Sequence, residues 1–389
     1  MSQPAEQPRI YLDNAATSWP KPPAVYEAVD DYQRRLGAPA GRSGYAEAAE
    51  VSGRIEAARR QLATLLGLAD ASHLIFTLNG TDSLNLVLHG LLQPGDHVIS
   101  TVVEHNSVLR PLADLERHGV TTTYVGCSAA GVVDPDDVRA ALRRNTRLVA
   151  VAHASNVTGA LQPIAAIARL AREAGVLVLC DAAQTAGHLP LDMRALGVDF
   201  LATSGHKGLL GPLGTGIVAI RPEVAHLLRS VRQGGTGTQS ERAEQPEELP
   251  GKFESGNLNV PGILGLAAGA AYLKSRGLDD VEQHGQLLCQ RLLAGLGEIG
   301  GLRVFGPPNV SDRVPLVSLV AEGYDPQELA LLLDAAHRIQ VRPGLHCAPR
   351  MHEALGTQAV GGTVRFSLGP FTTVDEIDTT IAALAELVS

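Results

Sequence analysis

Residues 203–216 read Thr-Ser-Gly-His-Lys-Gly-Leu-Leu-Gly-Pro-Leu-Gly-Thr-Gly, a run that places Lys207 between a histidine and several glycines. Lysine is rare in this chain, since only four of its 32 basic residues are lysines. A general preference for arginine explains part of that ratio. Arginine cannot lose its proton or form an imine, however, whereas a partly desolvated lysine can act as a nucleophile. The stretch therefore predicts that an amine able to lose its proton is needed at Lys207.

Short apolar segments on both sides of this stretch alternate with helical patterns. The segments expected to form strands are 74–77, 97–100, 123–125, 148–152, 176–180, 199–202 and 216–220. Helices are predicted between them, for example over 105–117 and 163–174. Short apolar strands that alternate with helices favour an α/β fold with a mostly parallel sheet covered on both faces.

The C-terminal part of the chain predicts a smaller α/β unit. A segment at 232–259 that is rich in Gly, Thr, Gln and Glu is expected to be a long loop. Beyond it we expect helices and strands at 261–275, 280–298, 316–320, 325–337, 339–342, 363–367 and 374–388. A chain of 389 residues has room for two domains. We therefore expect a large domain over 14–258 and a small domain formed by 1–13 and 259–389.

Composition and charge restrict the class of protein and its partners. A net charge of −9 argues against nucleic acid or an anionic membrane surface as the main partner, because both select for clustered positive charge. We find neither a secretory signal pattern nor a run of about 18 apolar residues, and so expect no membrane segment. The four cysteines are far apart and form no CxxC pair. That spacing predicts a cytoplasmic protein with neither a disulfide framework nor a metal site.

Polar residues with useful chemistry fall at the predicted ends of the strands. In a parallel sheet of this kind the ligand lies beyond the carboxyl ends of the strands. The candidates at those ends are Thr81, Asn156, Asp181, Ser204, His206 and Lys207. We therefore expect the ligand to lie at this edge of the sheet.

Asp181 directly follows the apolar segment 176–180 and allows two interpretations. Its carboxylate caps a helix or turn, or it pairs with a buried cation such as a pyridinium nitrogen. Such a pair about 4 Å apart interacts by roughly 4 kcal/mol at an effective dielectric near 20. Gln184, three residues further on, is close enough to reach the same ligand.

Gly80 and Thr81 lie between a predicted strand and a predicted helix. Exposed backbone N–H groups and the helix dipole at such a corner favour phosphate, although most Gly-Thr turns bind nothing. Ser204 and His206 could supply further phosphate contacts. His105 also follows a strand, and a lone histidine is more often structural than catalytic. The sequence leaves both interpretations of His105 open.

Cys347 lies in Arg-Pro-Gly-Leu-His-Cys-Ala-Pro at 342–349, a loop bounded by prolines that we expect to be exposed. A free cysteine is usually a small buried hydrophobe. Arg342 and His346 are close to Cys347 in sequence, however, and nearby positive charge favours the nucleophilic thiolate. Arg365 interrupts an apolar strand, and its burial would be costly without an anion. A substrate carboxylate is a reasonable partner for it.

Together these motifs resemble the class V aminotransferase group of fold-type I pyridoxal-phosphate enzymes, and within it the cysteine desulfurase and selenocysteine lyase branch. The resemblance runs from Tyr-Leu-Asp-Asn-Ala-Ala-Thr at 11–17 to Arg-Phe-Ser-Leu-Gly-Pro-Phe at 365–371. Its most specific parts are Asp-Ala-Ala-Gln at 181–184, Ser-Gly-His-Lys at 204–207, Phe-Glu-Ser-Gly at 253–256 and Arg-Pro-Gly-Leu-His-Cys at 342–347. It implies a mostly parallel central sheet flanked by helices, with a smaller C-terminal α/β domain.

The resemblance also implies how the cofactor, pyridoxal 5'-phosphate, would be bound. Lys207 would hold it covalently and move the Cα proton of the substrate. Asp181 would pair with the pyridine nitrogen, and Gln184 would contact the ring hydroxyl. His105 would stack on the ring and relay protons. The remaining cofactor-binding residues, which would hold the phosphate, are Gly80, Thr81, Ser204 and His206.

For the reaction, the resemblance implies a cysteine desulfurase that converts L-cysteine into L-alanine, with Cys347 taking the sulfur as a persulfide. The substrate-binding residues would be Arg365, Asn156 and Arg342. It further implies a homodimer and a protein sulfur acceptor, and it leaves open whether Thr236 reaches the phosphate site of the neighbouring subunit. A selenocysteine lyase, or another class V enzyme without desulfurase activity, stays the alternative. A binding scaffold without catalysis would not need these residues.

Overall fold

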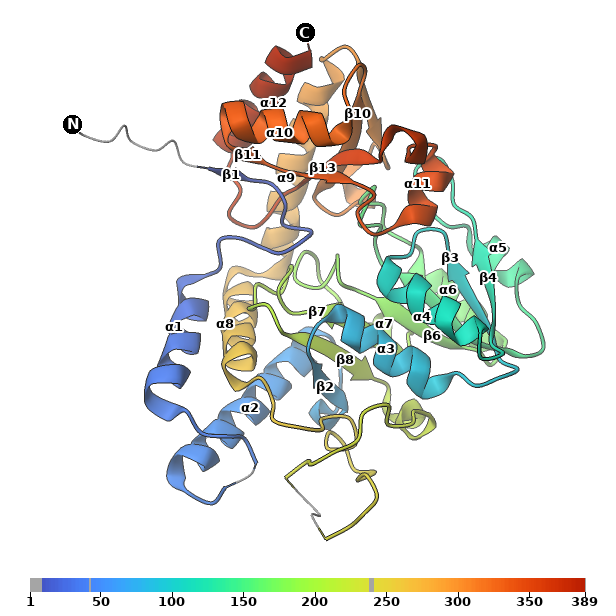
Figure 1. The fold of residues 1–389 in the computed structure, drawn as a ribbon, viewed down its shortest axis with the longest axis vertical. Helices are drawn as coiled ribbons and strands as arrows, with labels where there is room; N and C mark the ends of the chain where they lie inside the picture. The colour runs from blue at the N-terminus through green and yellow to red at the C-terminus, as the bar shows by residue number, and fades with distance from the viewer. Residues whose placement is uncertain (1–8, 42, 238–240, 389) are drawn as a thin grey trace.

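The computed structural model describes residues 9–41, 43–237 and 241–388, and a seven-stranded sheet forms its centre (Figure 1). In spatial order the strands are β2 (Leu74–Thr77), β8 (Gly216–Ile220), β7 (Phe200–Ser204), β6 (Leu177–Asp181), β5 (Thr146–Ala152), β3 (His97–Thr101) and β4 (Thr121–Val125). β8 is antiparallel to both of its neighbours, whereas every pairing from β7 to β4 is parallel. The prediction of a mostly parallel sheet is confirmed.

Side chains of the strands alternate between two buried cores, one on each face of this sheet. In β5, Val149 and Val151 pack in one core, whereas Leu148 and Ala150 pack in the other. The first core also contains residues of α2 (Ala46–Leu65), α6 (Ile164–Glu173) and α8 (Val260–Arg276). The second contains residues of α3 (Gly80–Leu91) and α4 (Asn106–Glu116). Burial on both faces is the reason that the inner strands are largely apolar, whereas the edge strand β4 is only partly buried and contains three threonines.

The C-terminal unit contains a four-stranded antiparallel sheet. Its strands, in spatial order, are β12 (Arg342–Gly344), β13 (Thr363–Ser367), β10 (Leu316–Ala321) and β9 (Leu302–Phe305). Its helices are α9 (Leu278–Gly297), α10 (Pro326–His337), α11 (Pro349–Leu355) and α12 (Val374–Val388). β9 and α11 were not predicted, because β9 is a half-buried edge strand and α11 has only seven residues. Short helices elsewhere in the chain are α1 (Pro23–Asp31), α5 (Pro135–Ala140) and α7 (Met193–Leu196).

The single strand predicted at 339–342 is wrong, because this segment forms two strands in two different sheets. β11 (Ile339–Gln340) pairs in parallel with β1 (Ile10–Tyr11), whereas β12 pairs antiparallel with β13. Pro343 cannot donate to a ladder, which suits β12 to its place at the edge of its sheet. The division puts Arg342 directly opposite Arg365 of β13.

The proposed division into two domains stays a prediction. The pairing of β1 with β11 joins the N-terminal segment to the C-terminal unit, as that division expects. α8, however, packs against α1 and α2, which is a contact across the predicted boundary near residue 259. Residues 1–8 lie outside the described part of the chain. Among the described residues, no helix combines the length and apolar character that crossing a membrane requires.

The long loop predicted at 232–259, of which 238–240 lie outside the described residues, is tied to the core by a buried ion pair. Arg59 of α2 donates from Nη1 and Nη2 to the two carboxylate oxygens of Glu254, at 2.7 and 2.9 Å. The side chains are only 1% and 6% exposed. The same carboxylate accepts the Phe76 N–H of β2 at 2.7 Å. Both the position and the orientation of the loop are thereby fixed against the sheet.

Replacing Glu254 with glutamine should lower the free energy of unfolding by about 3–5 kcal/mol, because the buried Arg59 charge then loses its buried counter-charge and keeps only the half-exposed carboxylate of Glu56. Glu56→Gln is the matched control, since Glu56 also accepts from Arg59, at 3.2 Å, but is 50% exposed. Its loss should cost less than about 1 kcal/mol. Urea unfolding followed by circular dichroism measures both values. Equal losses for the two variants would contradict the central role of Glu254.

Candidate active site

A cavity of about 370 Å³ lies at the carboxyl ends of three strands of the large sheet. Ala152, Asp181 and Ser204, the last residues of β5, β6 and β7, all line it. Every residue predicted to bind cofactor or substrate is also found in its lining: Gly80, Thr81, His105, Asn156, Asp181, Gln184, Ser204, His206, Lys207, Arg342 and Arg365. The fold thus brings these residues together from segments far apart in the sequence.

Lys207 lies in the loop after β7, and the N-terminal segment holds this loop in place. The Ser18 hydroxyl donates to the Lys207 carbonyl oxygen at 2.9 Å. Burial lowers the pKa of the Lys207 amine from 10.5 to about 8. The charges of Arg365 and Arg342 act in the same direction, and the carboxylate of Asp181 opposes them. The cavity therefore contains an amine that loses its proton close to physiological pH.

Asp181 and Gln184 follow β6 and are both buried. Asp181 Oδ1 accepts the Ala183 N–H at 2.9 Å, so this carboxylate does stabilise a turn. Burial raises the pKa of Asp181, while the Ala183 N–H and Lys207 act to lower it. Gln184 donates from Nε2 to the Ala15 carbonyl oxygen at 3.2 Å. A buried carboxylate in this position favours a cationic partner in the cavity.

His105 is the N-cap residue of α4, and its tautomer follows from that role. Its Nδ1 accepts the Ser107 N–H at 3.0 Å, so the proton of the neutral ring is on Nε2. Burial lowers the pKa of His105 to about 4, and the charges of Lys207 and Arg342 contribute to the decrease. The ring is therefore neutral at physiological pH and can donate through Nε2.

The corner between β2 and α3 has the features of an anion site. The Asn79 side chain caps α3 by accepting a backbone N–H of its first turn at 2.9 Å. The Gly80 N–H donates to the Ser204 hydroxyl oxygen at 3.2 Å. A Cβ atom at Gly80 would lie 2.5 Å from that oxygen, so only glycine allows the two segments to approach this closely. Thr81 is the second residue of the helix, whose N-terminus favours an anion.

His206 lines the same cavity and supplies a buried polar atom. Its Nδ1 is buried and has no hydrogen-bond partner among the described residues. Burial lowers the pKa of His206 to about 4, with smaller contributions from Lys207 and Lys21, so the ring is neutral. Buried ring nitrogens without a partner are uncommon in folded proteins. This nitrogen is therefore a candidate contact for a bound anion.

Two arginines from neighbouring strands face this cavity. Arg342 of β12 and Arg365 of β13 are register partners, and like charges in directly opposite positions repel each other. Arg365 is fully buried, and its Nη2 pairs with Asp13 Oδ1 at 2.8 Å. The anion that the burial of Arg365 was expected to need is therefore supplied by Asp13 within the chain itself. The role of Arg365 in substrate binding stays a prediction.

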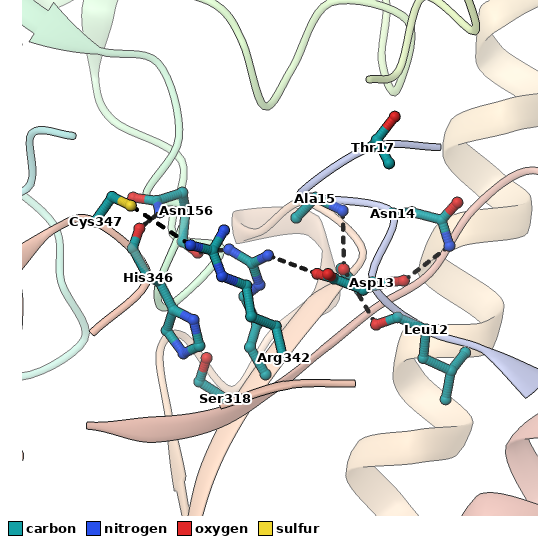
Figure 2. Close-up of polar contacts among 12 residues, drawn as sticks. Leu12, Asp13, Asn14, Ala15, Thr17, Asn156, Ser318, Arg342, His346 and Cys347 are labelled. Atoms are coloured by element: carbon teal, nitrogen blue, oxygen red, sulfur yellow. Dashed lines mark hydrogen bonds and ion pairs between the residues drawn. The ribbon is translucent and has the colours of Figure 1, made fainter. Parts of the chain in front are cut away.

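Asp13, which Figure 2 shows among the polar contacts of the N-terminal segment, was not among the residues predicted to act at the site. Asp13 was inside the motif at 11–17 but received no role, because its partner is 352 residues away. A buried arginine always needs acceptors, so a search for an unassigned carboxylate in another motif could have found it.

Asn156, which is also among the predicted substrate-binding residues, is already engaged by two other groups. It donates from Nδ2 to the His346 carbonyl oxygen at 2.6 Å, as Figure 2 shows. The backbone carbonyl oxygen of Asn156 accepts from Arg365 Nη1 at 3.0 Å. The Asn156 side chain therefore holds the loop of Cys347 in this structure.

Cys347 lies beside the cavity. It is not one of the described residues that line the cavity. Arg342 donates from Nη2 to its Sγ atom at 3.4 Å (Figure 2). The expectation of an exposed loop is wrong, because Cys347 is half-buried and His346 is only 2% exposed. Burial holds the pKa of His346 well below its usual value, so this ring is neutral. Positive charge next to the thiol therefore comes from Arg342 and not from His346.

Comparison with known proteins places this arrangement in a family. The model of the family "Aminotransferase class-V" matches residues 10–380. A protein of Methanothermobacter thermautotrophicus named "Probable cysteine desulfurase" is 35% identical over 388 residues, which cover 99% of this chain and 96% of that protein. A protein of Pyrococcus abyssi with the same name is 34% identical over 392 residues, which cover 99% and 96%.

Solved structures give the same result for the fold. The apo cysteine desulfurase from Thermococcus onnurineus matches with a TM-score of 0.92 and 33% identity, covering 98% of this chain and 94% of that one. The cysteine desulfurase CsdA from Escherichia coli, in its S-sulfonic acid form, matches with a TM-score of 0.88 and 31% identity, covering 98% and 96%. These likenesses confirm the predicted fold-type I architecture. The family match and the relatives together show that this chain belongs to the class V aminotransferase family.

Proposed function

We propose that this protein is a cysteine desulfurase that uses pyridoxal 5'-phosphate to convert L-cysteine into L-alanine, with the sulfur taken up by Cys347 as a persulfide. One observation carries the proposal. A single cavity combines the Lys207 amine, whose pKa is lowered to about 8, with the buried carboxylate of Asp181, and the Cys347 thiol lies beside it. The names of the relatives, which are called cysteine desulfurases, support the assignment of the thiol.

The residues of the cavity fit pyridoxal phosphate. Lys207 would hold its aldehyde carbon, Asp181 would pair with its ring nitrogen and Gln184 would contact its ring hydroxyl. When bound, the cofactor supplies an electron sink for the α-carbon of the substrate. The phosphate would be held at the N-terminus of α3 and by polar groups around it, among them the His206 Nδ1, which has no partner among the described residues. These phosphate-binding residues are Gly80, Thr81, Ser204 and His206.

Lys207 and His105 are the groups that would move protons. Once the substrate amine has displaced it, the Lys207 amine would take the proton from the α-carbon of the substrate, which a pKa of about 8 allows near physiological pH. His105 is neutral with its proton on Nε2, since Nδ1 accepts the Ser107 N–H. Its Nε2–H can therefore donate a hydrogen bond to the substrate while the ring is neutral, and to relay a proton the ring would take one up at Nδ1 as Nε2 releases one. A stacked ring would keep Nε2 close to the substrate.

Cys347 would then take the sulfur. Its thiolate attacks the sulfur of the substrate, so that a sulfur–sulfur bond forms while the bond between that sulfur and the substrate β-carbon breaks. The electron pair of the broken bond stays on the carbon, which a proton converts into the methyl group of alanine. Arg342 donates from Nη2 to the Cys347 sulfur at 3.4 Å, which places a positive charge beside the attacking atom. No external oxidant is needed, because the two electrons that the two sulfurs lose on forming the sulfur–sulfur bond are gained by the β-carbon as it becomes a methyl group.

The substrate carboxylate would be bound by the two opposed arginines of the cavity. Arg365 Nε has no partner among the described residues, although Nη1 and Nη2 are engaged. Arg342 faces it across β12 and β13, and an anion between them would relieve their repulsion. A contact of Asn156 with the same carboxylate would require its amide to leave the His346 carbonyl oxygen.

The proposal also includes the wider setting of the enzyme. We expect a cytoplasmic homodimer that passes the persulfide sulfur to an acceptor protein. All four cysteines are unpaired, which supports a reducing compartment. Thr236, the residue considered for a contact across the dimer, lines a second cavity together with Ile55, Pro250 and Glu254. Selenocysteine lyase activity is the alternative, and the last of the following three predictions separates the two.

Replacing Lys207 with alanine should abolish the visible absorbance of the bound cofactor and the formation of alanine from L-cysteine, because the covalent link and the proton carrier are both lost. The measurement is an absorbance spectrum of the purified protein together with an alanine assay. Lys274→Ala, at an exposed position of α8, is the control and should change neither. Retention of turnover by the Lys207 variant would refute the proposed role.

The rate at which the apoprotein captures pyridoxal phosphate should rise about tenfold per pH unit below pH 8 and level off above it, because only the neutral Lys207 amine reacts. Arg342 acts to lower this pKa, so Arg342→Gln should move the midpoint to higher pH. Stopped-flow absorbance between pH 6 and about 10 measures both profiles. A midpoint that moves to lower pH in the variant would contradict this electrostatic account.

Replacing Cys347 with serine should leave the cofactor absorbance unchanged but lower alanine formation from L-cysteine by more than about 100-fold, because the sulfur acceptor is lost. Cys127→Ser, at a half-buried cysteine elsewhere in the chain, is the control and should stay active. If the variant kept full activity on L-cysteine, the persulfide step would be wrong. Full activity on selenocysteine alone, in both the variant and the unmodified protein, would support the alternative.

A further inference from the structure

His346 and Cys347 adopt a backbone conformation that is unusual for residues other than glycine. Their φ angles are +48° and +60°, which place two consecutive non-glycine residues in the left-handed region. A Cβ atom makes this region unfavourable, and for two adjacent residues it persists only where the surroundings impose it. Some group must therefore hold this pair in place.

Three hydrogen bonds hold the pair, and each comes from a different segment. The His346 ring is buried, and its Nε2 lies 2.9 Å from the Thr363 hydroxyl at the start of β13. The His346 carbonyl oxygen accepts from the Asn156 side chain at 2.6 Å. The Cys347 carbonyl oxygen accepts the N–H of Asn106, the first residue of α4, at 2.7 Å. The loop is thus fixed by β13 of the C-terminal sheet and by two segments of the large sheet's unit, Asn156 and α4.

The His346 ring acts here as a neutral hydrogen-bonding anchor. It is packed against the ring of His352, with 5.4 Å between the two ring centres, and both side chains are buried. His352 is held in the same manner, because its Nδ1 lies 2.8 Å from the Thr357 hydroxyl. The two histidines therefore form a matched pair, in which only His346 is adjacent to the reactive thiol.

We infer that His346, anchored by Thr363, is a positioning residue that directs the Cys347 thiol toward the side of Arg342 and the cavity. The inference rests on the proposed function. His346 does not line the cavity, so its effect on the thiol would pass through the backbone. When the imidazole is fixed by Thr363, the left-handed backbone directs the Cys347 side chain toward the Arg342 guanidinium. The Cys347 Sγ atom is found beside that guanidinium. Without the anchor, the pair would relax and the thiol would turn away.

The test is Thr363→Val in the holoenzyme, which removes the hydroxyl and keeps the shape of the side chain. We expect kcat for alanine formation to fall about tenfold, because a nucleophile displaced by a fraction of an ångström reacts much more slowly. KM should change less than about twofold and the cofactor spectrum should not change, since this bond does not act on substrate binding. A variant with unchanged kcat would overturn the inference.

A second measurement follows the thiol itself. Iodoacetate is anionic and iodoacetamide is neutral, so the ratio of their rates of reaction with Cys347 reports the positive charge beside the sulfur. In Thr363→Val this ratio, measured on the Cys347 peptide by mass spectrometry, should fall at least about threefold. A ratio equal to that of the unmodified protein would mean that the thiol has not moved, and the inference would fail.

Thr357→Val is the matched control, because Thr363 and Thr357 are both buried and each holds one histidine through its hydroxyl. Thr363→Val removes one buried hydrogen bond, and Thr357→Val removes the bond to Nδ1 together with a longer one to the His352 carbonyl oxygen at 3.4 Å. The control should lose a similar amount of stability to urea but should keep kcat and the alkylation ratio. If it lowered kcat as much as Thr363→Val, general loosening of the loop would explain the result, and the inference would be overturned.

A pair of substitutions at His346 separates the anchor from the backbone conformation. The amide of glutamine can reach the position of Nε2, whereas asparagine is shorter but tolerates the left-handed region better. We expect His346→Gln to keep more activity than His346→Asn, and the opposite order would overturn the inference.

If the unmodified protein formed no alanine from L-cysteine, the proposed function would fail, while the alkylation ratios would still decide whether Thr363 positions the thiol.

Discussion

The guanidinium of Arg365 is fully buried, and the hydrogen bonds that it makes link the separate parts of the site. Its Nη2 binds Asp13 of the N-terminal segment, and its Nη1 binds the carbonyl oxygen of Asn156. Asn156 in turn donates to the carbonyl oxygen of His346, next to Cys347. Loss of either end would leave a buried cation without full compensation, which is costly. One charge therefore keeps the N-terminal segment, the large sheet and the thiol loop in a fixed relation.

The cavity carries more positive than negative charge, and that excess explains two of its properties together. Lys207, Arg342 and Arg365 line it with Asp181 as the acidic residue among them. The burial and mutual repulsion of these groups keep the Lys207 amine and the His105 ring close to their neutral forms. The same charges favour anions such as a phosphate and a carboxylate. Readiness to transfer protons and affinity for anionic ligands thus have one electrostatic origin.

Much of this site could be predicted from the sequence, because its residues follow apolar strands whose carboxyl ends meet at one edge of a sheet. Asp181 and Ser204 end their strands as that argument requires. Long-range contacts could not be predicted in this way. No local pattern reveals that Asp13 pairs with Arg365, or that the His346 ring turns inward against Thr363. The division of 339–342 between two sheets was missed for the same reason, since each half pairs with a distant strand.

The position of Cys347 beside the cavity, and not within it, has a consequence for the order of events. On the proposed mechanism alanine forms inside the cavity, while the sulfur is carried on a loop of the C-terminal unit. The two products therefore leave by different routes, and the first can depart before any acceptor arrives. Turnover then divides into two half-reactions with ping-pong kinetics, in which the concentration of acceptor sets the rate of only the second. An acceptor needs to recognise the rim of the cavity alone and never has to reach the cofactor.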